Sequence, residues 1–282
     1  MRQPAPTEIQ GLQELEYAVD HDYRSGSPHL LHWNLHDRLA ALLRETIGAV
    51  VDAGLPPTVL EIGAGHGGFT EPALAAGAQV TATEMSRPSV ERLSHRYRTN
   101  PALRVVFDPD GSLGMLGGRR FSLIVCSSVL HHIPDYLGFL SGPMLAHLEP
   151  GGAFMSIQDP LWYPSVDRLT RRLDRSSYLL WRMAQGDYRK AMATFFRRRR
   201  GVFDETNPAD MVEYHVVRHG VDHDAIQQLL SDHFEDVDLQ TYWSTMASAM
   251  QRVGEKVGRP NTFAFRALRY RCEANVEPAS SE

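Results

Sequence analysis

Cysteine is scarce in this sequence, which contains two among 282 residues. Cys126 lies in an apolar run and Cys272 near the C-terminus, so the pair offers neither a disulfide framework nor the spacing of a cysteine-ligated zinc site. The sequence also lacks the apolar leader of a signal peptide and the run of about 18 apolar residues that a membrane-spanning helix requires. These absences predict a protein of the reducing cytoplasm that is not inserted in a membrane.

A surplus of positive charge is also missing. The formal net charge is −5 and the isoelectric point is about 6.2, whereas binding to nucleic acid or to an anionic membrane surface calls for a strongly basic field. We therefore expect a small-molecule partner and no nucleic acid. With 43% hydrophobic residues, a chain of 282 residues can bury one large α/β core, and a second complete domain is not expected.

Short apolar runs alternate with helical stretches from residue 58 onward. The runs that predict strands are 58–62, 79–84, 104–108, 121–127, 153–158, 235–243 and 261–269, and helices are expected near 70–77, 87–98 and 135–148. The run Leu123–Cys126 has no polar alternation, which is typical of parallel strands buried on both faces. The last two runs lie too close in sequence for a crossover helix with its loops, so we expect an antiparallel pair. The predicted fold class is α/β, with a doubly wound, mostly parallel seven-stranded sheet and an antiparallel last strand.

The remaining segments predict how the chain is divided around this core. Apolar residues recur at helical spacing from Leu30 to Val51, and about 60 residues after Asp159 interrupt the strand pattern with arginine and aromatic residues. Such an insertion is too long for a plain connection, and we interpret it as a helical substrate lid. The expected division is N-terminal helices that cap the site (1–57), the core (58–159), the lid insertion (160–218), the C-terminal part of the core (219–270) and a tail (271–282).

Residues 59–69, Val-Leu-Glu-Ile-Gly-Ala-Gly-His-Gly-Gly-Phe, predict a strand that runs into a glycine turn and then a helix. Glycine lets the backbone approach a ligand closely, and the first turn of the helix offers free N–H groups. The spacing Gly63-x-Gly65-x-x-Gly68 satisfies the dinucleotide fingerprint, and Glu84 ends the next strand where a ribose-binding acid is expected. An NAD(P)-dependent oxidoreductase is therefore one interpretation.

Three features favour a cationic amino-acid cofactor over a dinucleotide. Glu61, two residues before the first glycine, places a carboxylate at the mouth of the first strand, where it suits an ammonium group and would repel a pyrophosphate. The glycine turn follows a long helical prelude, whereas a dinucleotide fold commonly opens with it. The expected antiparallel pair at the end of the sheet is the third feature.

These segments resemble the class I S-adenosylmethionine (SAM) dependent methyltransferases of small molecules, through most of residues 58–160 and again through 219–270. The motifs that carry the resemblance are Glu61-x-Gly63-x-Gly65-x-Gly67, Phe121–Val125 followed by Val129–Ile133, and Leu148-Glu149-Pro150-Gly151-Gly152. Two positions depart from the family pattern. Ser122 stands where the family usually has aspartate, and Asp108-Pro109-Asp110 offers two carboxylates for adenine.

The resemblance implies SAM as the cofactor and assigns residues to it. Glu84 would accept the ribose hydroxyls, and Asp110-Gly111 would lie near adenine. The implied cofactor-binding residues are Glu61, Gly63, Ala64, Gly65, Glu84, Met85, Asp110, Gly111 and Ser127.

The end of the fourth predicted strand is expected to supply the catalytic group. Strands of such a sheet end at the ligand crevice, so residues 127–132 should lie beside the transferring methyl group. A hydroxyl acceptor must lose its proton as the methyl arrives, and histidine is well matched to take it. We predict His131 as this base, followed by His132, then by Tyr136 and Asp159.

The predicted function is thus methyl transfer from SAM to a hydroxyl, or else an amine, of a small molecule such as a natural product or a sugar. O-methylation is favoured because an amine needs less help from a base. The alternatives are the NAD(P)-dependent oxidoreductase and a noncatalytic methyltransferase-like scaffold that binds partners only.

Two further features have simpler explanations than a new site. His29, His32 and His36 share one helix face, but no carboxylate completes a metal site, so no metal is predicted. His29, together with Tyr17 and Tyr23, is expected instead to help close the cofactor site. The arginine-rich run 195–200 is interpreted as a solvated face of the lid helices, with a clamp for a phosphate or carboxylate as the alternative.

Overall fold

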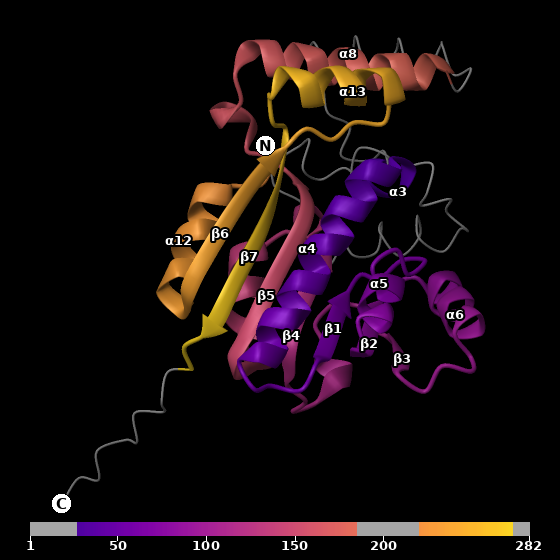
Figure 1. The fold of residues 1–282 in the computed structure, drawn as a ribbon, viewed down its shortest axis with the longest axis vertical. Coiled ribbons are helices and arrows are strands. Elements are labelled where there is room, and N and C mark those ends of the chain that lie inside the picture. Colours follow the sequence, from indigo (N-terminus) through magenta and orange to yellow (C-terminus); the bar gives the residue numbers. More distant parts are fainter. Residues whose placement is uncertain (1–26, 185–219, 273–282) are drawn as a thin grey trace, which may run out of the picture.

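The computed structural model of the chain describes residues 27–184 and 220–272. At their centre lies one seven-stranded sheet with the order β3-β2-β1-β4-β5-β7-β6 (Figure 1). The strands are β1 (Thr58–Ile62), β2 (Gln79–Glu84), β3 (Leu103–Phe107), β4 (Phe121–Ser127), β5 (Leu148–Pro160), β6 (Phe234–Tyr242) and β7 (Thr262–Tyr270). β1 to β5 pair in parallel, and β7 is antiparallel to both β5 and β6. The predicted fold class, including the antiparallel last strand, is confirmed.

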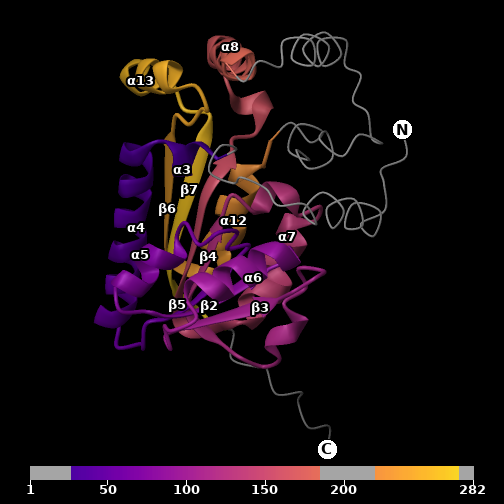
Figure 2. The same ribbon diagram turned by 90° about the vertical axis from the view of Figure 1, so that its right-hand side faces the viewer.

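Helices cover both faces of this sheet (Figure 2). The helices are α4 (Trp33–Asp52), α5 (Thr70–Ala75) and α6 (Arg87–Arg96) in one layer, and α7 (Tyr136–Phe139) and α12 (His223–His233) in the other. Successive residues of β4 alternate between the layers, since Leu123 and Val125 pack with α4 whereas Ile124 and Cys126 pack with the α7 and α12 side. Apolar residues are therefore needed at every position of the strand, which explains the unbroken apolar run in the sequence.

β5 begins earlier than the sequence predicted. The expected strand starts at residue 153, but Leu148 already pairs with Phe121 of β4. The register then shifts before Leu123 pairs with Ala153, so the motif at 148–152 lies within the strand as an irregular insertion. The early start of β5 was not predicted because proline and glycine at 150–152 interrupt the apolar alternation without ending the pairing of the strands.

The helix expected near 135–148 is present, but it is not a regular α-helix throughout. α7 comprises only Tyr136–Phe139 and continues as a π-helical turn over Leu140–Met144. Pro143 lies inside this turn and has no N–H to donate to a regular helical ladder. The chain leaves the helix in time for Leu148 to enter β5.

Two helices lie across the carboxyl end of the parallel strands, α8 (Arg168–Ala184) and α13 (Ser248–Val257), and they contact each other (Figure 1). The hydroxyls of Ser177 in α8 and Thr245 before α13 share a hydrogen bond. The short helix α3 (Pro28–Leu31) and the start of α4 reach the same end, where His32 Nε2 lies 2.7 Å from the carbonyl oxygen of Thr245. Segments from both halves of the chain thus meet at this end of the sheet.

Only part of the expected lid falls within this description. Residues 160–184 include α8, whereas residues 185–218, with the arginine-rich run 195–200, lie outside the described residues. Tyr17, Tyr23 and positions 273–282 of the expected tail also lie outside them. The lid, the N-terminal cap and the tail remain predictions.

Candidate functional site

The turn after β1 places the glycine motif against the turn after β4. Gly63 and Gly67 have φ angles of +66° and +83°, in the left-handed region that favours glycine. A Cβ on Gly63 would lie 2.6 Å from Cγ2 of Val129, which is too close for any side chain. The N–H groups of Gly63 and Ala64 both donate to the carbonyl of Thr83, at 3.0 and 3.1 Å. Glycine is therefore required at position 63, and the turn is anchored to the end of β2.

The carboxylate of Glu84 joins the same turn to the end of β2. Its Oε2 accepts the N–H of Gly65 at 2.7 Å, and its Oε1 accepts the N–H of Ser86 at 2.9 Å. Burial raises the pKa of Glu84, and the N–H donors oppose that rise. Sδ of the following residue, Met85, lies 3.6 Å from the position of a Cβ built on Gly111. The residues predicted for ribose and for adenine are therefore neighbours.

Glu61 is buried beneath the glycine turn, and not at an open strand mouth as the sequence suggested. Its side chain is 3% exposed and accepts a hydrogen bond from the hydroxyl of Thr70 in α5. Burial raises the pKa of Glu61 to about 7; the Thr70 hydrogen bond opposes this rise and the charge of Glu84 adds to it. A buried carboxyl of this kind is stabilised as an anion by a nearby cation, because the cation replaces the lost hydration.

Of the two carboxylates that follow β3, the structure buries Asp108 and exposes Asp110. Oδ2 of Asp108 accepts the N–H of Leu113 at 3.0 Å, whereas its Oδ1 is buried and has no hydrogen-bond partner among the described residues. Burial raises the pKa of Asp108. Oδ1 of Asp110 accepts the N–H of Ser112 at the surface. Sequence reasoning chose Asp110, although Asp108 directly follows the strand, where side chains of a parallel sheet reach the crevice.

A histidine and an aspartate form a buried pair after β4. Nδ1 of His131 lies 2.8 Å from Oδ1 of Asp159 at the end of β5, and the same oxygen accepts the main-chain N–H of His131 at 3.1 Å. Oδ2 of Asp159 accepts the hydroxyl of Ser156 at 2.8 Å. A carboxylate can only accept, so Nδ1 carries the proton, and Nε2 of a neutral His131 is left as a base. Asp159, which the sequence ranked as an alternative base, is thus the partner of His131.

The backbone that leads from β4 to this pair has an irregular conformation. Ser127 ends β4 beside Ile157 of β5, and Ser128 then adopts a φ of +60° while its N–H donates to the carbonyl of Ile157 at 2.8 Å. The chain turns at once into a 3₁₀ helix over Leu130–His132. Within this turn the ring of His132 is centred 4.0 Å from that of His131.

The N-terminal helices lie against the glycine turn from the other side. A Cβ on Gly68 would lie 2.5 Å from Cδ2 of Leu30. His36 Nε2 is 3.0 Å from the carbonyl oxygen of Gly68, and the rings of His29 and His36 are centred 5.8 and 5.3 Å from that of Phe69. The segment around α3 therefore closes one side of the cofactor turn.

The N-terminal histidines serve different contacts. Burial, followed by the charges of His36 and His131, lowers the pKa of His29 to about 3, so His29 is neutral at physiological pH. His32 contacts Thr245, as described above. Within residues 27–184 and 220–272, no group of three or more His, Cys, Asp or Glu side chains is arranged to hold a metal ion.

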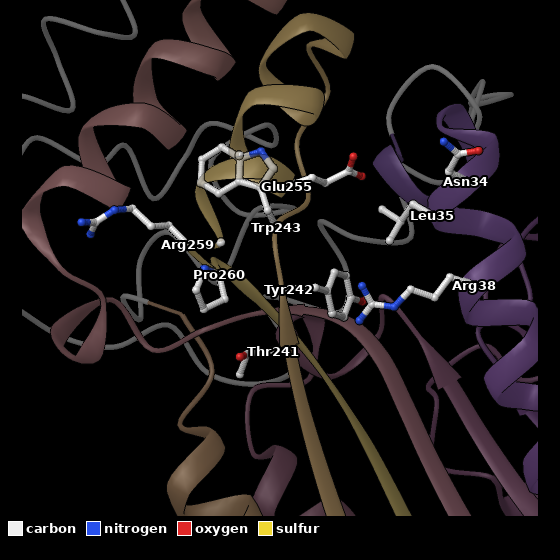
Figure 3. A pocket seen from close by; sticks show the side chains of 11 residues that line it. Asn34, Leu35, Arg38, Thr241, Tyr242, Trp243, Glu255, Arg259 and Pro260 are labelled. Carbon is white, nitrogen blue, oxygen red and sulfur yellow. The ribbon is translucent and has the colours of Figure 1, made fainter.

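A cavity of about 450 Å³ lies beside this site, between α4, the end of β6 and α13 (Figure 3). Arg38 of α4 extends over the ring of Tyr242, with the guanidinium carbon 5.1 Å from the ring centroid. Trp243 forms the side nearest α13, where its indole N–H donates to the carbonyl of Met250 at 3.1 Å. The ring of Tyr242 therefore lines this cavity, at the edge of the sheet where β5 also ends.

None of the helices in the described part of the chain has the length and apolar character needed to cross a membrane.

Comparisons with known proteins show what part of this chain is similar to. Residues 60–154 match a family model described as a methyltransferase domain. No curated protein sequence matches the chain. Among solved structures, an O-methyltransferase family protein from Burkholderia thailandensis is similar with a TM-score of 0.51 and 13% identity, over 93% of this chain and 64% of that one. This chain thus spans just under two thirds of the length of that protein.

Two other solved structures match over almost their whole length. The N-methyltransferase NodS from Bradyrhizobium japonicum, in complex with S-adenosyl-L-homocysteine, has a TM-score of 0.52 and 15% identity over 93% of this chain and 97% of its own. The 1,6-didemethyltoxoflavin-N1-methyltransferase from Burkholderia thailandensis, bound to its substrate and S-adenosylhomocysteine, has a TM-score of 0.52 and 19% identity over 95% and 92%. At these identities the likeness establishes a shared fold.

The raised pKa of Glu61 predicts a pH-dependent stability. Its pKa is about 7 in the folded chain and near the ordinary 4.5 when unfolded. The stability that the protonated form contributes is therefore fully present below pH 4.5 and is lost as the pH rises through 7. We expect Glu61→Gln to be more stable relative to wild type at about pH 8 than at about pH 5, by up to about 3 kcal/mol. Urea denaturation of the ligand-free protein at the two pH values measures this difference.

Glu71→Gln is the matched control for this measurement, because Glu71 is an exposed carboxylate in α5 paired with Arg96. Its stability difference from wild type should be the same at both pH values. A pH-independent difference for Glu61→Gln would contradict the burial of an ionisable Glu61.

Proposed function

We propose, from the match of residues 60–154 to a methyltransferase domain and from the sheet topology, that the chain transfers the methyl group of S-adenosylmethionine to a hydroxyl group of a small-molecule acceptor. The observation that carries the proposal is the His131–Asp159 pair, which lies at the same edge of the sheet as the glycine turn. When bound, SAM supplies a methyl group on a positively charged sulfur. Every other requirement of the reaction falls on residues of this chain.

The donor set around the glycine turn fits SAM. Glu61 is a buried carboxyl suited to the ammonium of the methionine part, and Glu84 has lone pairs left to accept the ribose hydroxyls. The buried Oδ1 of Asp108, which has no partner among the described residues, suits the amino group of adenine. Gly63, Ala64 and Gly65 would line the methionine part, and Met85, Gly111 and Ser127 would border the cofactor, as the resemblance implies.

The same carboxyls argue against a dinucleotide, although the glycine spacing satisfies that fingerprint. A pyrophosphate at the start of α5 would lie near the buried Glu61, whose charge would repel it. A cofactor with a net positive charge and no phosphate is the better match.

The proposed reaction uses His131 as the general base. Nε2 of His131 takes the proton of the acceptor hydroxyl as the methyl group arrives. Asp159 holds Nδ1 protonated, orients the ring and stabilises the imidazolium that forms. The enclosing segments would hold the acceptor against the bound cofactor, since correct positioning is the main requirement of such a displacement.

The acceptor would be enclosed from the side of α8 and α13. We propose that the insertion 160–218 sets acceptor specificity, because its described part lies across the carboxyl end of the sheet. The N1-methyltransferase from B. thailandensis acts on 1,6-didemethyltoxoflavin. This supports a small molecule, such as a natural product, as the acceptor class.

The choice of cofactor can be tested directly. Titration calorimetry should show SAM binding in the micromolar range and no binding of NAD or NADP, because the site presents buried carboxyls to the ligand. Binding of a nicotinamide cofactor without SAM would replace this proposal by an oxidoreductase. SAM binding without turnover of any acceptor would favour a noncatalytic scaffold.

Asp108 and Asp110 provide a matched pair of variants for the adenine contact. Asp108→Asn should weaken SAM about tenfold, since its single remaining oxygen cannot serve both Leu113 and an adenine amino group. Asp110→Asn should leave the dissociation constant unchanged. The reverse result in the same calorimetric titration would restore Asp110 as the adenine residue.

The general base is tested in the enzyme loaded with SAM and an acceptor, found by screening small molecules for the gain of one methyl group in mass spectrometry. His131→Ala should lower turnover about 100-fold or more, with SAM affinity unchanged, because only the proton transfer is lost. His95→Ala, at an exposed histidine of α6, is the control and should keep full turnover. If His131→Ala also keeps it, His131 is not the base.

A further inference from the structure

An extra residue in β5 precedes the catalytic aspartate. Along the antiparallel pairing with β7, Ile157 lies opposite Ala264 and Asp159 lies opposite Phe263, so Gln158 has no counterpart. Gln158 has a φ of +67°, a left-handed conformation that residues other than glycine rarely adopt. This is a β-bulge in the middle of a buried sheet, next to the catalytic pair.

The bulge decides where Asp159 points. In a regular strand, Ser156 and Asp159 would face opposite sides of the sheet, because side chains alternate with a period of two. Here the hydroxyl of Ser156 donates to Oδ2 of Asp159 at 2.8 Å, so the two side chains share one side. On that side Asp159 meets His131. Without the left-handed turn at Gln158, the pair would not form.

A bulged residue loses its place in the hydrogen-bond ladder, and Tyr242 supplies the missing partner. The Tyr242 hydroxyl accepts the N–H of Gln158 at 2.9 Å and lies 3.4 Å from its Oε1, to which it donates. The Gln158 amide in turn donates to the hydroxyl of Ser244 at 2.6 Å. Both partners come from the end of β6 and the loop after it, although β7 separates β6 from β5 in the sheet.

Tyr242 is itself held in place. Its ring is 5% exposed and lies between the sheet and Arg38 of α4, as Figure 3 shows. Burial raises the pKa of Tyr242 well above its ordinary value, so the hydroxyl keeps its proton and can donate and accept at once.

We propose that Tyr242 is a positioning residue for methyl transfer: its hydroxyl holds Gln158 in the left-handed conformation that turns Asp159 toward His131. This role rests on the proposed function of His131 as the base. Tyr242 acts through Gln158 and Asp159, and the proposal assigns it no contact with cofactor or acceptor. Ser244 assists by fixing the Gln158 side chain.

The test uses Tyr242→Phe, which keeps the ring beneath Arg38 and removes only the hydroxyl. The direct measurement is the NMR signal of the proton on Nδ1 of His131, identified by its loss in His131→Ala. In wild type the carboxylate of Asp159 should hold this proton far downfield and slow its exchange with solvent. In Tyr242→Phe the signal should broaden or vanish, and the methyl-transfer rate should fall about tenfold with SAM affinity unchanged.

A second substitution distinguishes positioning from general stability. Glycine adopts positive φ without strain, so Gln158→Gly in the Tyr242→Phe background should restore the Nδ1 proton signal and most of the rate. If Tyr242→Phe does not fold, Ser244→Ala provides the same test, with faster exchange of this proton expected. Tyr97→Phe is the matched control, because the Tyr97 hydroxyl has no hydrogen-bond partner among the described residues, and its signal should match wild type.

An unchanged His131 signal and rate in Tyr242→Phe, or in Ser244→Ala where that variant is used, would overturn the proposal. Failure of Gln158→Gly to restore the signal would also overturn it. The NMR result does not depend on turnover. A His131 signal that depends on Tyr242 in a protein that methylates no acceptor would therefore refute the proposed function and leave the positioning role intact.

Discussion

The site depends on carboxylates buried at one edge of a parallel sheet. Glu61, Glu84 and Asp108 lie at or near the ends of β1, β2 and β3, and burial raises the pKa of each. Removing a carboxylate from water is costly unless hydrogen bonds or a cation compensate. Main-chain N–H groups partly compensate Glu84 and Asp108, and a hydroxyl alone serves Glu61. These hydrogen bonds leave some of the desolvation cost uncompensated. Binding of a cationic, hydroxyl-rich ligand would recover it.

The sequence predicted the sheet well because the sheet follows from short-range physics. A strand buried on both faces must be apolar at every position, and Leu123–Cys126 shows this directly. The glycine turn could be predicted from the sequence equally well. Gly63 combines a left-handed φ with contact to Val129, and only glycine meets both requirements. The antiparallel last strand was also predicted, although the connection before it, judged too short for a helix, holds α13.

The site was less predictable, because its decisive contacts join residues that are distant in sequence or break a local rule. His131 and Asp159 are 28 residues apart and meet only because β4 and β5 are neighbours. Asp110 looked as suitable as Asp108, since burial is not visible in a run of three polar or turn-forming residues. The π-helical turn at Leu140–Met144 has no periodicity that distinguishes it from an α-helix.

The irregular backbone of the site is concentrated in adjacent strand ends, and this has a physical reason. Ser128 and Gln158 have left-handed φ angles of +60° and +67°, the first after β4 in the turn that leads to His131 and the second within β5 directly before Asp159. Such conformations persist only where the surroundings fix them, and here the N–H of Ser128 donates to Ile157 and that of Gln158 to Tyr242. In a regular pair of strands, the two-residue alternation alone would decide which side of the sheet each of the two side chains faces. The rigid sheet therefore provides the stability that lets two strained residues aim an aspartate at a histidine.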